Sequence, residues 1–462
     1  MTTFPEHHEN VTAPEIIARM RAVAPPGQAR LDAGTAGALR DLTRQLITAR
    51  DGAAAEHARF LAIRDRDLCV PEDALAGRLA GAVILVTGGT GCIGSALMGQ
   101  LAGRCPARLV SVTRGGDRGS PQPGAEYLRA DVRDRPAIDQ LIAAVRPDLV
   151  FHVAAQRDPG LAETEVHRTV TTNVLGTRNV LAAAAAARVP QVVCASTGKA
   201  LRPYSPDIYT ASKRAAEWIA AAAAAAGGTM ISAARFTHVL DNSIIYRRLL
   251  DWAAADAVIR LHSPDIAFYV QSAAESAQLL LLACLGTARG ELRIHAISDL
   301  GWPASLLDLA LAVLASSGSP APVYISGYDR GYEEIPFPGL YDPVTAGDVS
   351  PLLNAFEAAA VVTSPCPRVD AFRLDMTIEP GAAKLLGELA GTCARTGNPA
   401  AVRAALDELS WALLDCTLRA APRRALTRSA AMARRHAGSL DAGHQRILQA
   451  IEDHARSVTA SG

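Results

Sequence analysis

The sequence has no excess of charge of either sign, because 46 lysines and arginines balance 46 aspartates and glutamates among its 462 residues. Nucleic acids and anionic membranes are bound by basic faces, so this balance gives no electrostatic reason to expect either partner. Long apolar runs are missing as well, since the longest apolar stretches are alanine runs such as Ala220–Ala226, far short of a membrane span. We expect a soluble protein with neither a nucleic-acid nor a membrane partner.

No pattern in the sequence predicts a zinc site, a disulfide framework or a signal peptide. The eight cysteines include no Cys-x-x-Cys pair, so neither a zinc site nor a disulfide framework is indicated. The N-terminal residues Met1–His8 show no basic region followed by an apolar one, unlike a signal peptide. His7 and His8 fit a solvated tail better than metal ligands. These features favour a reducing, cytoplasmic setting and no bound metal.

The length predicts two or three structural units. Helical spacing and composition predict helices at Ala13–Val23 and Ala33–Ile63, separated by the breaker Pro25–Gly27. We expect residues 1–80 to form a helical N-terminal extension that packs on the core or on a partner subunit.

From Gly81 onward, strand and helix patterns alternate, which is typical of a parallel sheet covered on both faces. Strands are predicted at Arg108–Thr113, Tyr127–Ala130, Asp148–Val153, Gln191–Ala195 and Met230–Arg235, and helices at Arg135–Val145, Glu163–Ala187 and Ser272–Cys284. Glu291–Ile297 and Val323–Ser326 are candidate strands of a small substrate lobe. The expected fold class is α/β, a Rossmann-type doubly wound parallel sheet over residues 81–345.

Residues 346–462 return to helical patterns rich in alanine, leucine and arginine. Helices are predicted at Val349–Ala360, Pro380–Ala394, Pro399–Arg419, Pro422–His436 and Leu440–Ser457. We expect a helical C-terminal domain whose charged residues form solvated faces.

The strongest motif begins with Val83–Val86, an apolar run that predicts a buried parallel strand. Gly88, Gly91 and Gly94 follow at Gly-x-x-Gly-x-x-Gly spacing, and Ser95–Leu101 continues as a helix. This order is typical of a dinucleotide site, in which the glycines allow a tight turn and a close approach to the pyrophosphate. The start of the helix offers N–H groups to the phosphates. The expected cofactor-binding residues here are Gly88, Thr90, Gly91, Cys92, Ile93 and Gly94.

The second strand ends at the residues that choose between NAD and NADP. An NAD site usually places a carboxylate about 20 residues after the glycine motif, where it bonds the ribose 2′-hydroxyl. Arg114 stands at that distance and could instead receive a 2′-phosphate, which favours NADP over NAD. The alternative is that Arg114 is solvated and Asp117 reaches the ribose.

Two further pairs follow strands at the same edge of the sheet. Asp131 and Val132 come after the third strand, where they are placed to meet the adenine. Ala154 and Ala155 come after the fourth strand, and their small side chains let the backbone approach the cofactor. Either pair by itself would be read as structural.

Tyr209 and Lys213 stand four residues apart and therefore share one face of a helix. An ammonium beside a phenol lowers the pKa of the phenol, so Tyr209 could exchange a proton with a substrate oxygen near neutral pH. Thr197, twelve residues upstream, follows the fifth strand and can hydrogen-bond the same oxygen. This set predicts hydride transfer at a carbinol, with Lys213 also contacting the cofactor.

Several segments together resemble the extended short-chain dehydrogenase/reductases. Within them, the chain is similar to the bacterial polysaccharide-biosynthesis branch of epimerases and dehydratases, typified by UDP-N-acetylglucosamine 4,6-dehydratases. The matching segments are Thr87–Gly94, Pro147–Gln156, Thr172–Asn179, Ser196–Ala200, Tyr209–Lys213, His262–Ile266 and Ala274–Gln278. The resemblance covers about residues 81–345 and leaves out both helical ends.

The resemblance implies a mechanism. Tyr209, with Lys213 and Thr197, would remove a hydroxyl proton while hydride passes to the nicotinamide. The resulting ketone acidifies the neighbouring carbon, which allows elimination or epimerisation before hydride returns. Lys199 matches the lysine of the branch's Thr-Asp-Lys motif and is a candidate base at that carbon, with a surface lysine as the alternative. Members are often homodimers through core helices, an interface that the added helical segments could replace or block.

Three departures from the branch bear on the substrate. Where the dehydratases carry the aspartate of Thr-Asp-Lys, this chain has Gly198, which cannot protonate a leaving hydroxyl. His238 replaces an asparagine used near the substrate, either as a new acid/base group or as a packed polar residue. The Arg-Pro-Gly-Glu-Lys motif is reduced to Asp329–Glu333, in which Arg330 could still touch a diphosphate.

Three functions follow as hypotheses. The first is a cofactor-recycling enzyme on a nucleotide sugar in biosynthesis, with epimerisation favoured over dehydration because Gly198 removes the acid. The second is a one-way NADPH ketoreductase or alcohol dehydrogenase in specialised metabolism. The third is a non-catalytic, cofactor-binding scaffold, which the intact set of Thr197, Tyr209 and Lys213 disfavours.

Overall fold

The computed structural model describes residues 11–115, 121–328, 337, 348–374, 376–377, 379–436, 438 and 440–460. The chain divides into two compact units, each assembled from separate stretches of sequence. The first unit takes Met1–Arg66, His238–Val270 and Gly301–Asp329, and the second takes Asp67–Thr237, Gln271–Leu300 and Arg330–Gly462. The sequence-based domain boundaries at residues 80 and 345 stay a prediction.

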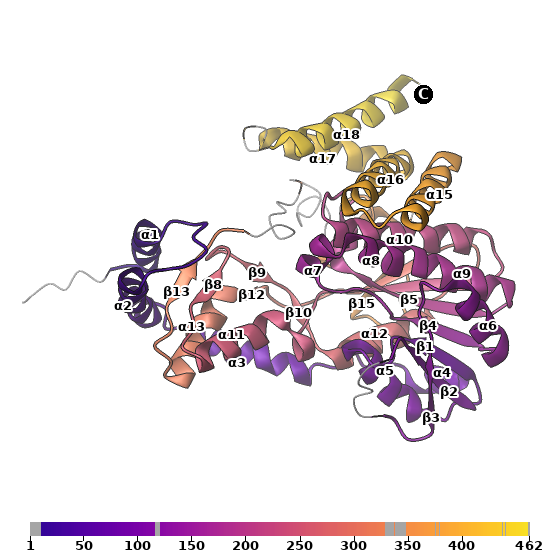
Figure 1. Cartoon of the computed structure of the whole chain (residues 1–462). Coiled ribbons are helices and arrows are strands. Elements are labelled where there is room, and N and C mark those ends of the chain that lie inside the picture. The colour runs from indigo at the N-terminus through magenta and orange to yellow at the C-terminus, as the bar shows by residue number, and fades with distance from the viewer. Residues whose placement is uncertain are drawn as a thin grey trace, which may run out of the picture. The chain divides into compact units, whose positions relative to one another are not determined.

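The second unit is built on a nine-stranded sheet with the order β14-β15-β11-β6-β5-β4-β1-β2-β3 (Figure 1). Its strands are β1 Val83–Thr87, β2 Arg108–Thr113, β3 Ala125–Arg129, β4 Leu149–His152, β5 Gln191–Thr197, β6 Met230–Phe236, β11 Arg293–Ile297, β14 Val361–Val362 and β15 Val369–Arg373. The strands from β3 to β11 run parallel, whereas β15 is antiparallel to β11 and β14 to β15. The order β3-β2-β1-β4-β5-β6 confirms the predicted Rossmann-type fold class.

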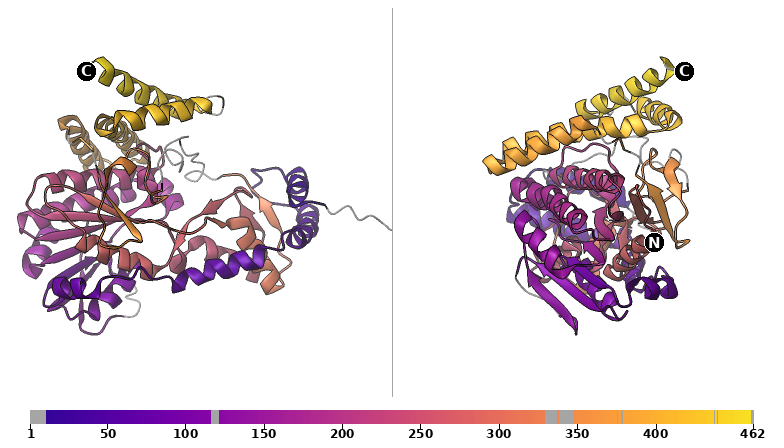
Figure 2. Two further views of the ribbon diagram at one scale, coloured as in Figure 1. Left: turned by 180° about the vertical axis from the view of Figure 1, so that it is seen from behind. Right: turned by 90° about the vertical axis from the view of Figure 1, so that its right-hand side faces the viewer.

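Helices cover both faces of this sheet (Figure 2). One face carries α4 Glu72–Leu79, α5 Cys92–Ala102 and α12 Ala273–Leu285; the other carries α6 Arg135–Val145, α9 Gly176–Ala186 and α10 Ile208–Ala225. Because neither face meets solvent, the central strands can be apolar along their whole length. Ile84, Leu85 and Val86 of β1 are accordingly all buried.

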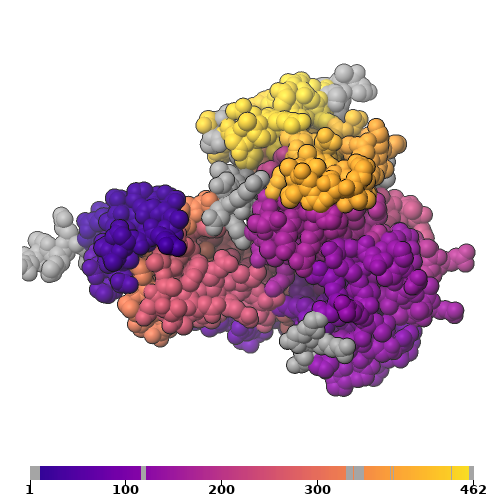
Figure 3. All heavy atoms as spheres, in the orientation of Figure 1, coloured from indigo at the N-terminus to yellow at the C-terminus, as the bar shows by residue number. Residues whose placement is uncertain are grey.

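Four C-terminal helices follow the sheet: α15 Pro380–Arg395, α16 Pro399–Ala420, α17 Arg423–Arg435 and α18 Ala442–Ala460. Their bounds agree closely with the predicted ones. α15 pairs with α16, and α17 pairs with α18. α16 packs on α10 and α8, so its orange surface lies directly against the magenta helices of the sheet unit (Figure 3).

The helix predicted at Val349–Ala360 is wrong. Only Ala358–Ala360 forms a 3-10 turn, and β14 and β15 then extend the sheet. Side chains within the segment bond its own backbone: Ser350 accepts from the Leu352 N–H, and Asn354 from the N–H groups of Phe356 and Glu357. Such local bonds compete with a helix.

Three other elements differ from prediction. The helix over Ala33–Ile63 is broken into α2 Ala33–Ala49 and α3 Ala53–Ala62, followed by a 3-10 turn at Ile63–Asp65. The helix over Glu163–Ala187 is divided into α7 Pro159–Thr164, α8 Val166–Val170, a π turn at Thr171–Leu175 and α9. β11, predicted in the substrate lobe, pairs with β6 in the main sheet.

The first unit is a small lobe around the parallel pair β8 Ile259–Leu261 and β13 Val323–Ile325. It also contains α1 Ala13–Val23, α2, α3, a 3-10 turn Leu240–Asn242, α11 Ile244–Ala254, α13 Leu306–Ser317 and the short strands β7 His238–Val239, β9 Ala267–Phe268 and β12 Ala304–Ser305; β10 is Val270–Gln271. Phe60 and Tyr324 are buried in its core, so the N-terminal helices are part of the lobe. Among the described residues, no helix combines the length and apolar character that crossing a membrane requires.

Candidate active site

The glycine motif forms the loop between β1 and α5, at the point where the strand order reverses. Such switch points in doubly wound sheets are where ligands bind, outside the carboxyl ends of the strands. Gly88 has a φ of +76°, a left-handed conformation that favours glycine. A Cβ added there would lie 2.8 Å from the backbone N and Cα of Ala154, which follows β4. The loop and the end of β4 therefore meet with no room for a side chain.

The loop fits the phosphates of a dinucleotide on its outer side. A Cβ at Gly94 would overlap the carbonyl oxygen of Gly88, whereas one at Gly91 would meet only that oxygen, at 3.3 Å. The loop is therefore tightly packed against itself at Gly94, whereas Gly91 has free space on its outer side. No side chain caps the N-terminus of α5, whose first turn carries Cys92 and Ile93. A helix start of this kind attracts anions, so the residues present fit a nicotinamide dinucleotide.

The adenosine end of the predicted site lies beyond β2 and β3. Thr90 Oγ1 donates to Thr113 Oγ1 (3.3 Å), which ties the glycine loop to the end of β2. Arg114 follows and is exposed. Arg129, in β3, donates its Nε to the Arg114 carbonyl (3.1 Å), so a second guanidinium lies beside this turn. Asp117 lies outside the described residues.

Asp131 and Val132 are held by neighbours of their own. The Asp131 carboxylate pairs with Arg133 at 2.6 Å. Burial raises the pKa of Asp131, but the hydrogen bonds from Arg133 and the charge of Arg114 outweigh it and lower the pKa. Val132 is buried against Gly176 of α9, so its backbone is the part left for an adenine. Ala155, next to Ala154, is exposed.

Thr197, Tyr209 and Lys213 come together at the carboxyl end of β5. Thr197 is the last residue of β5, and the other two share a face of α10. The Thr197 hydroxyl lies beside the Tyr209 phenol and lowers its pKa as a hydrogen-bonding partner. Lys213 is buried and donates its Nζ to the Ala195 carbonyl (2.7 Å). Three of the four predicted catalytic residues therefore form one cluster, and the fourth is Lys199.

The ionisation of Tyr209 differs from the expectation. Burial raises the pKa of Tyr209 to about 12, although the hydrogen bond with Thr197 lowers it in part. Burial also lowers the pKa of Lys213. The Lys213 ammonium is directed at the Ala195 carbonyl, so it does not produce the lowered tyrosine pKa that the spacing predicted. Tyr209 is therefore a neutral phenol at neutral pH.

The start of α10 is held by residues that the motifs did not single out. Asp207 caps the helix by accepting from the Thr210 N–H (2.7 Å). Glu163 accepts from the Ile208 N–H (2.8 Å), one residue before Tyr209. Lys199 lies 4.0 Å from Asp207; burial lowers the pKa of Lys199, and Asp207 opposes that shift. An aspartate just before a helical run is an N-cap signal, so Asp207 could have been found from sequence.

A buried polar chain runs from β1 to α9 beneath the site. Thr177 donates to the Asn173 carbonyl (2.7 Å), so it must accept from Nε2 of His152 (3.1 Å). Nδ1 of His152 then accepts from the Thr87 hydroxyl (2.8 Å). Burial, followed by the charge of Lys213, lowers the pKa of His152 to about 3. The histidine is neutral and serves as a structural link.

Asn173 lies in the π turn and faces the helix that carries Tyr209. Its Nδ2 donates to the Gln156 carbonyl and to Ser212 Oγ, both at 3.0 Å. Its Oδ1 accepts from the Gln156 N–H (2.8 Å). A π turn inside a helix often marks a functional position. Here it places the side-chain amide of Asn173 so that it bonds both α10 and the segment that follows β4.

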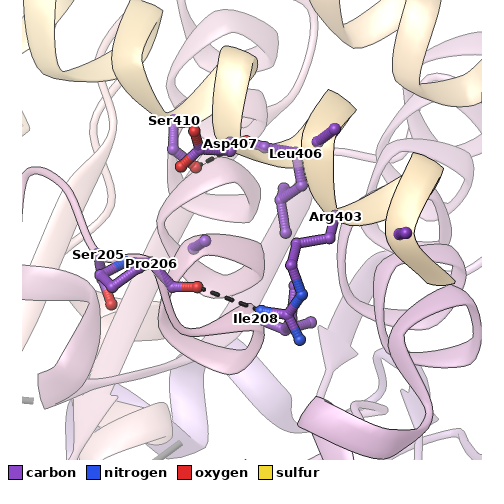
Figure 4. A pocket seen from close by; sticks show the side chains of 10 residues that line it. Ser205, Pro206, Ile208, Arg403, Leu406, Asp407 and Ser410 are labelled. Carbon is purple, nitrogen blue, oxygen red and sulfur yellow. Dashed lines mark hydrogen bonds between the residues drawn. The ribbon is translucent and has the colours of Figure 1, made fainter. Parts of the chain in front are cut away.

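A pocket of about 410 Å³ lies between α16 and the loop before Tyr209 (Figure 4). Arg403 bridges it, reaching Glu163 (2.6 Å) and the Pro206 carbonyl (3.5 Å). Asp407, on the same helix, accepts from the Tyr204 hydroxyl (2.7 Å). The C-terminal helices thus hold the loop that leads into Tyr209.

The two predicted substrate residues are His238 and Arg330. His238 belongs to the first unit, where its Nε2 lies 2.6 Å from Ser243 Oγ and its ring packs on Phe268. Burial lowers the pKa of His238 to about 4, as in a packed polar residue. Arg330 lies outside the described residues.

Residues 84–332 match the model of a family described as polysaccharide biosynthesis protein, which is more than half of the chain. The chain belongs to this family. The match confirms the resemblance to the polysaccharide-biosynthesis branch of the extended short-chain dehydrogenase/reductases. It also confirms that the chain is an enzyme of the short-chain dehydrogenase/reductase type.

Relatives from the curated proteins match in the same region. The probable polysaccharide biosynthesis protein EpsC of Bacillus subtilis is 27% identical over 282 residues, 56% of this chain and 46% of EpsC. A UDP-glucose 4-epimerase of Rickettsia felis is 26% identical over 263 residues, 54% of this chain and 74% of that enzyme. The chain spans about half the length of the first curated relatives that it matches.

Among solved structures, that of Pen from Bacillus thuringiensis resembles this fold with a TM-score of 0.52 and 20% identity. It covers 65% of this chain and 89% of Pen.

Proposed function

We propose that this chain is an NADP-dependent oxidoreductase that oxidises and re-reduces one carbinol of a nucleotide sugar, with epimerisation as the outcome. The observation that carries the proposal is the cluster at the end of β5, where half-buried Thr197 and Tyr209 lie beside each other and the buried Lys213 bonds the Ala195 carbonyl of the same strand. The matched family and the relative named UDP-glucose 4-epimerase support the substrate class.

The residues divide the work according to their positions. Thr197 orients the substrate hydroxyl. Tyr209 first gives its own proton to solvent, and the resulting phenolate takes the proton of the substrate hydroxyl as the carbonyl forms. Lys213 lies one turn further along the same helix face, where it holds the Ala195 carbonyl (2.7 Å), and it is proposed to contact the cofactor. The dinucleotide, when bound, supplies the acceptor and donor of hydride. Lys199 is the proposed second base, and it stands beside the Asp207 carboxylate.

NADP, and not NAD, is the proposed cofactor because guanidiniums gather where the adenosine ribose would lie. Arg114 and Arg129 lie beside the turn after β2. A charge-assisted bond to a 2′-phosphate contributes about 1.5–3 kcal/mol, or roughly 10–100-fold in affinity. An Arg114→Ala variant should lose NADP affinity by that factor and keep NAD affinity. Arg108→Ala, in the exposed pair with Glu126 at the other end of β2, is the matched control.

The experiment for the whole proposal is turnover of UDP-sugars by the purified chain, followed by product mass and by the reduced-nicotinamide absorbance. An isomer of unchanged mass, formed without net change in that absorbance, supports the epimerase. Stoichiometric consumption of NADPH with a ketone, and no turnover of UDP-sugars, would instead establish the one-way ketoreductase. A purified chain that turns over neither substrate, with a Tyr209→Phe variant that leaves the cellular function unchanged, would point to the non-catalytic scaffold.

A further inference from the structure

Position 198 has no room for a side chain. Gly198 follows Thr197 directly, and a Cβ added to it would lie 2.6 Å from Cδ2 of Leu352 and 3.5 Å from its Cγ. Both residues are buried. Leu352, more than 150 positions along the chain, thus fills the space that a side chain at 198 would take.

The backbone of Leu352 is bonded on both sides, so only a rotation of its side chain could make room at position 198. Its carbonyl accepts from Nη1 of Arg235 (2.9 Å), and its N–H donates to Ser350 Oγ (3.2 Å). Asn354 then donates its Nδ2 to the carbonyl of Leu201 (2.6 Å), at the end of the 3-10 turn that begins with Gly198. The segment Ser350–Glu357 is therefore fastened to the turn that follows Thr197.

A buried group of four charges anchors the end of this segment. Arg235 is 0% exposed and binds two carboxylates as a fork, Glu217 at 2.7 and 2.8 Å and Glu357 at 2.7 and 2.8 Å. Arg214 completes the group with bonds to Glu357 (3.1 Å) and Glu217 (3.4 Å). Ser196, next to Thr197, donates to Glu217 (2.6 Å). The segment is thereby joined to β5, β6 and α10 at once.

We propose that Leu352 is a specificity-determining residue, which keeps any proton-donating side chain out of position 198 and so confines the enzyme to isomerising substrates that keep all their oxygens. The proposal rests on the proposed function. An elimination would need Lys199 to take a proton from the carbon beside the ketone. An acid would have to give its proton to the hydroxyl that leaves as water while the carbon–carbon double bond forms. With Leu352 in the space of a side chain at position 198, no such acid follows Thr197.

The first test measures the contact itself. Gly198→Ala should lower the urea midpoint of unfolding, and it should lower kcat/KM at least tenfold. Leu352→Ala added to Gly198→Ala should recover at least half of each loss. Leu353→Ala, at the equally buried next residue, is the matched control and should give no recovery. An active Gly198→Ala enzyme of normal stability, or a double variant no better than the single one, would overturn the contact.

The second test measures specificity through the mass of the product. Gly198→Asp combined with Leu352→Ala should release, from the sugar that the wild type isomerises, a fraction of product lighter by one water. Gly198→Asn with Leu352→Ala has the same shape without the acid and should release only the isomer. A folded, active Asp variant that forms only isomer refutes the role of Leu352. If the wild-type enzyme does not turn over the sugar, the proposed function is refuted. The urea midpoints of the Gly198 and Leu352 variants still test whether the two residues are in contact.

Discussion

Glu357 is the most informative single position for stability, because three guanidinium bonds converge on it. Arg235 donates to both of its oxygens (2.7 and 2.8 Å), and Arg214 donates to one (3.1 Å). Glu357→Gln keeps the shape and removes the charge, which leaves two buried arginines facing Glu217 alone. Removing one partner of a buried ion pair leaves an uncompensated charge and costs about 3–5 kcal/mol. We expect a loss of that size in the free energy of unfolding.

The assay for Glu357→Gln is equilibrium unfolding in urea, monitored by tryptophan fluorescence and circular dichroism. Glu126→Gln is the matched control: it breaks a pair with Arg108 of the same fork geometry (2.6 and 2.8 Å), with both side chains exposed. Exposed pairs are screened by water, so the control should unfold at the wild-type midpoint. A Glu357→Gln loss below about 1 kcal/mol would refute the claim that this carboxylate balances the buried arginines.

Three further predictions test the site. Tyr209→Phe should lower kcat/KM by at least about a hundredfold, with NADP affinity unchanged by titration calorimetry. Asp207→Ala should remove the cap of α10 and about 1 kcal/mol of unfolding free energy in urea, while Asp207→Asn keeps most of it. The pKa of His152 is lowered to about 3 in the folded protein, so the unfolded chain takes up a proton at a higher pH than the folded one. The contribution of neutral His152 to the free energy of unfolding is therefore complete above about pH 6.5 and falls by about 1.4 kcal/mol for each pH unit below that. His152→Asn should flatten the pH dependence of the urea midpoint, and an unchanged slope would contradict the assignment of a neutral histidine.

The cofactor half of the site could be predicted because its signals are local. Val83–Gly94 contains the strand, the turn and the helix start in twelve consecutive residues, and each part requires its own residue types. Tyr209 and Lys213 share a helix face by spacing alone. Arg108–Thr113 became β2 with the predicted bounds, since the apolar residues Leu109, Val110 and Val112 form a short buried run that only Ser111 interrupts.

The substrate half could not be predicted in the same way, because its contacts join residues far apart in the chain. The pattern around Gly198 gives no sign of Leu352, and no local rule pairs Arg235 with Glu357. The lowered pKa expected for Tyr209 also failed for this reason: spacing places Lys213 nearby, but burial and the Ala195 carbonyl decide where its ammonium is directed.

The segment Val349–Ala360, wrongly predicted to be a helix, contacts Gly198, where the sequence differs from the dehydratase motif. Its alanines favour a helix locally, yet Glu357 is taken up by Arg235, and Asn354 bonds both its own backbone and the Leu201 carbonyl. Long-range bonds to buried charges outweigh helix propensities of a few tenths of a kcal/mol per residue. Sites of function are where local rules give way to such contacts. An irregular segment fastened beside Thr197 is therefore better explained by what it excludes from position 198 than by its own conformational preference.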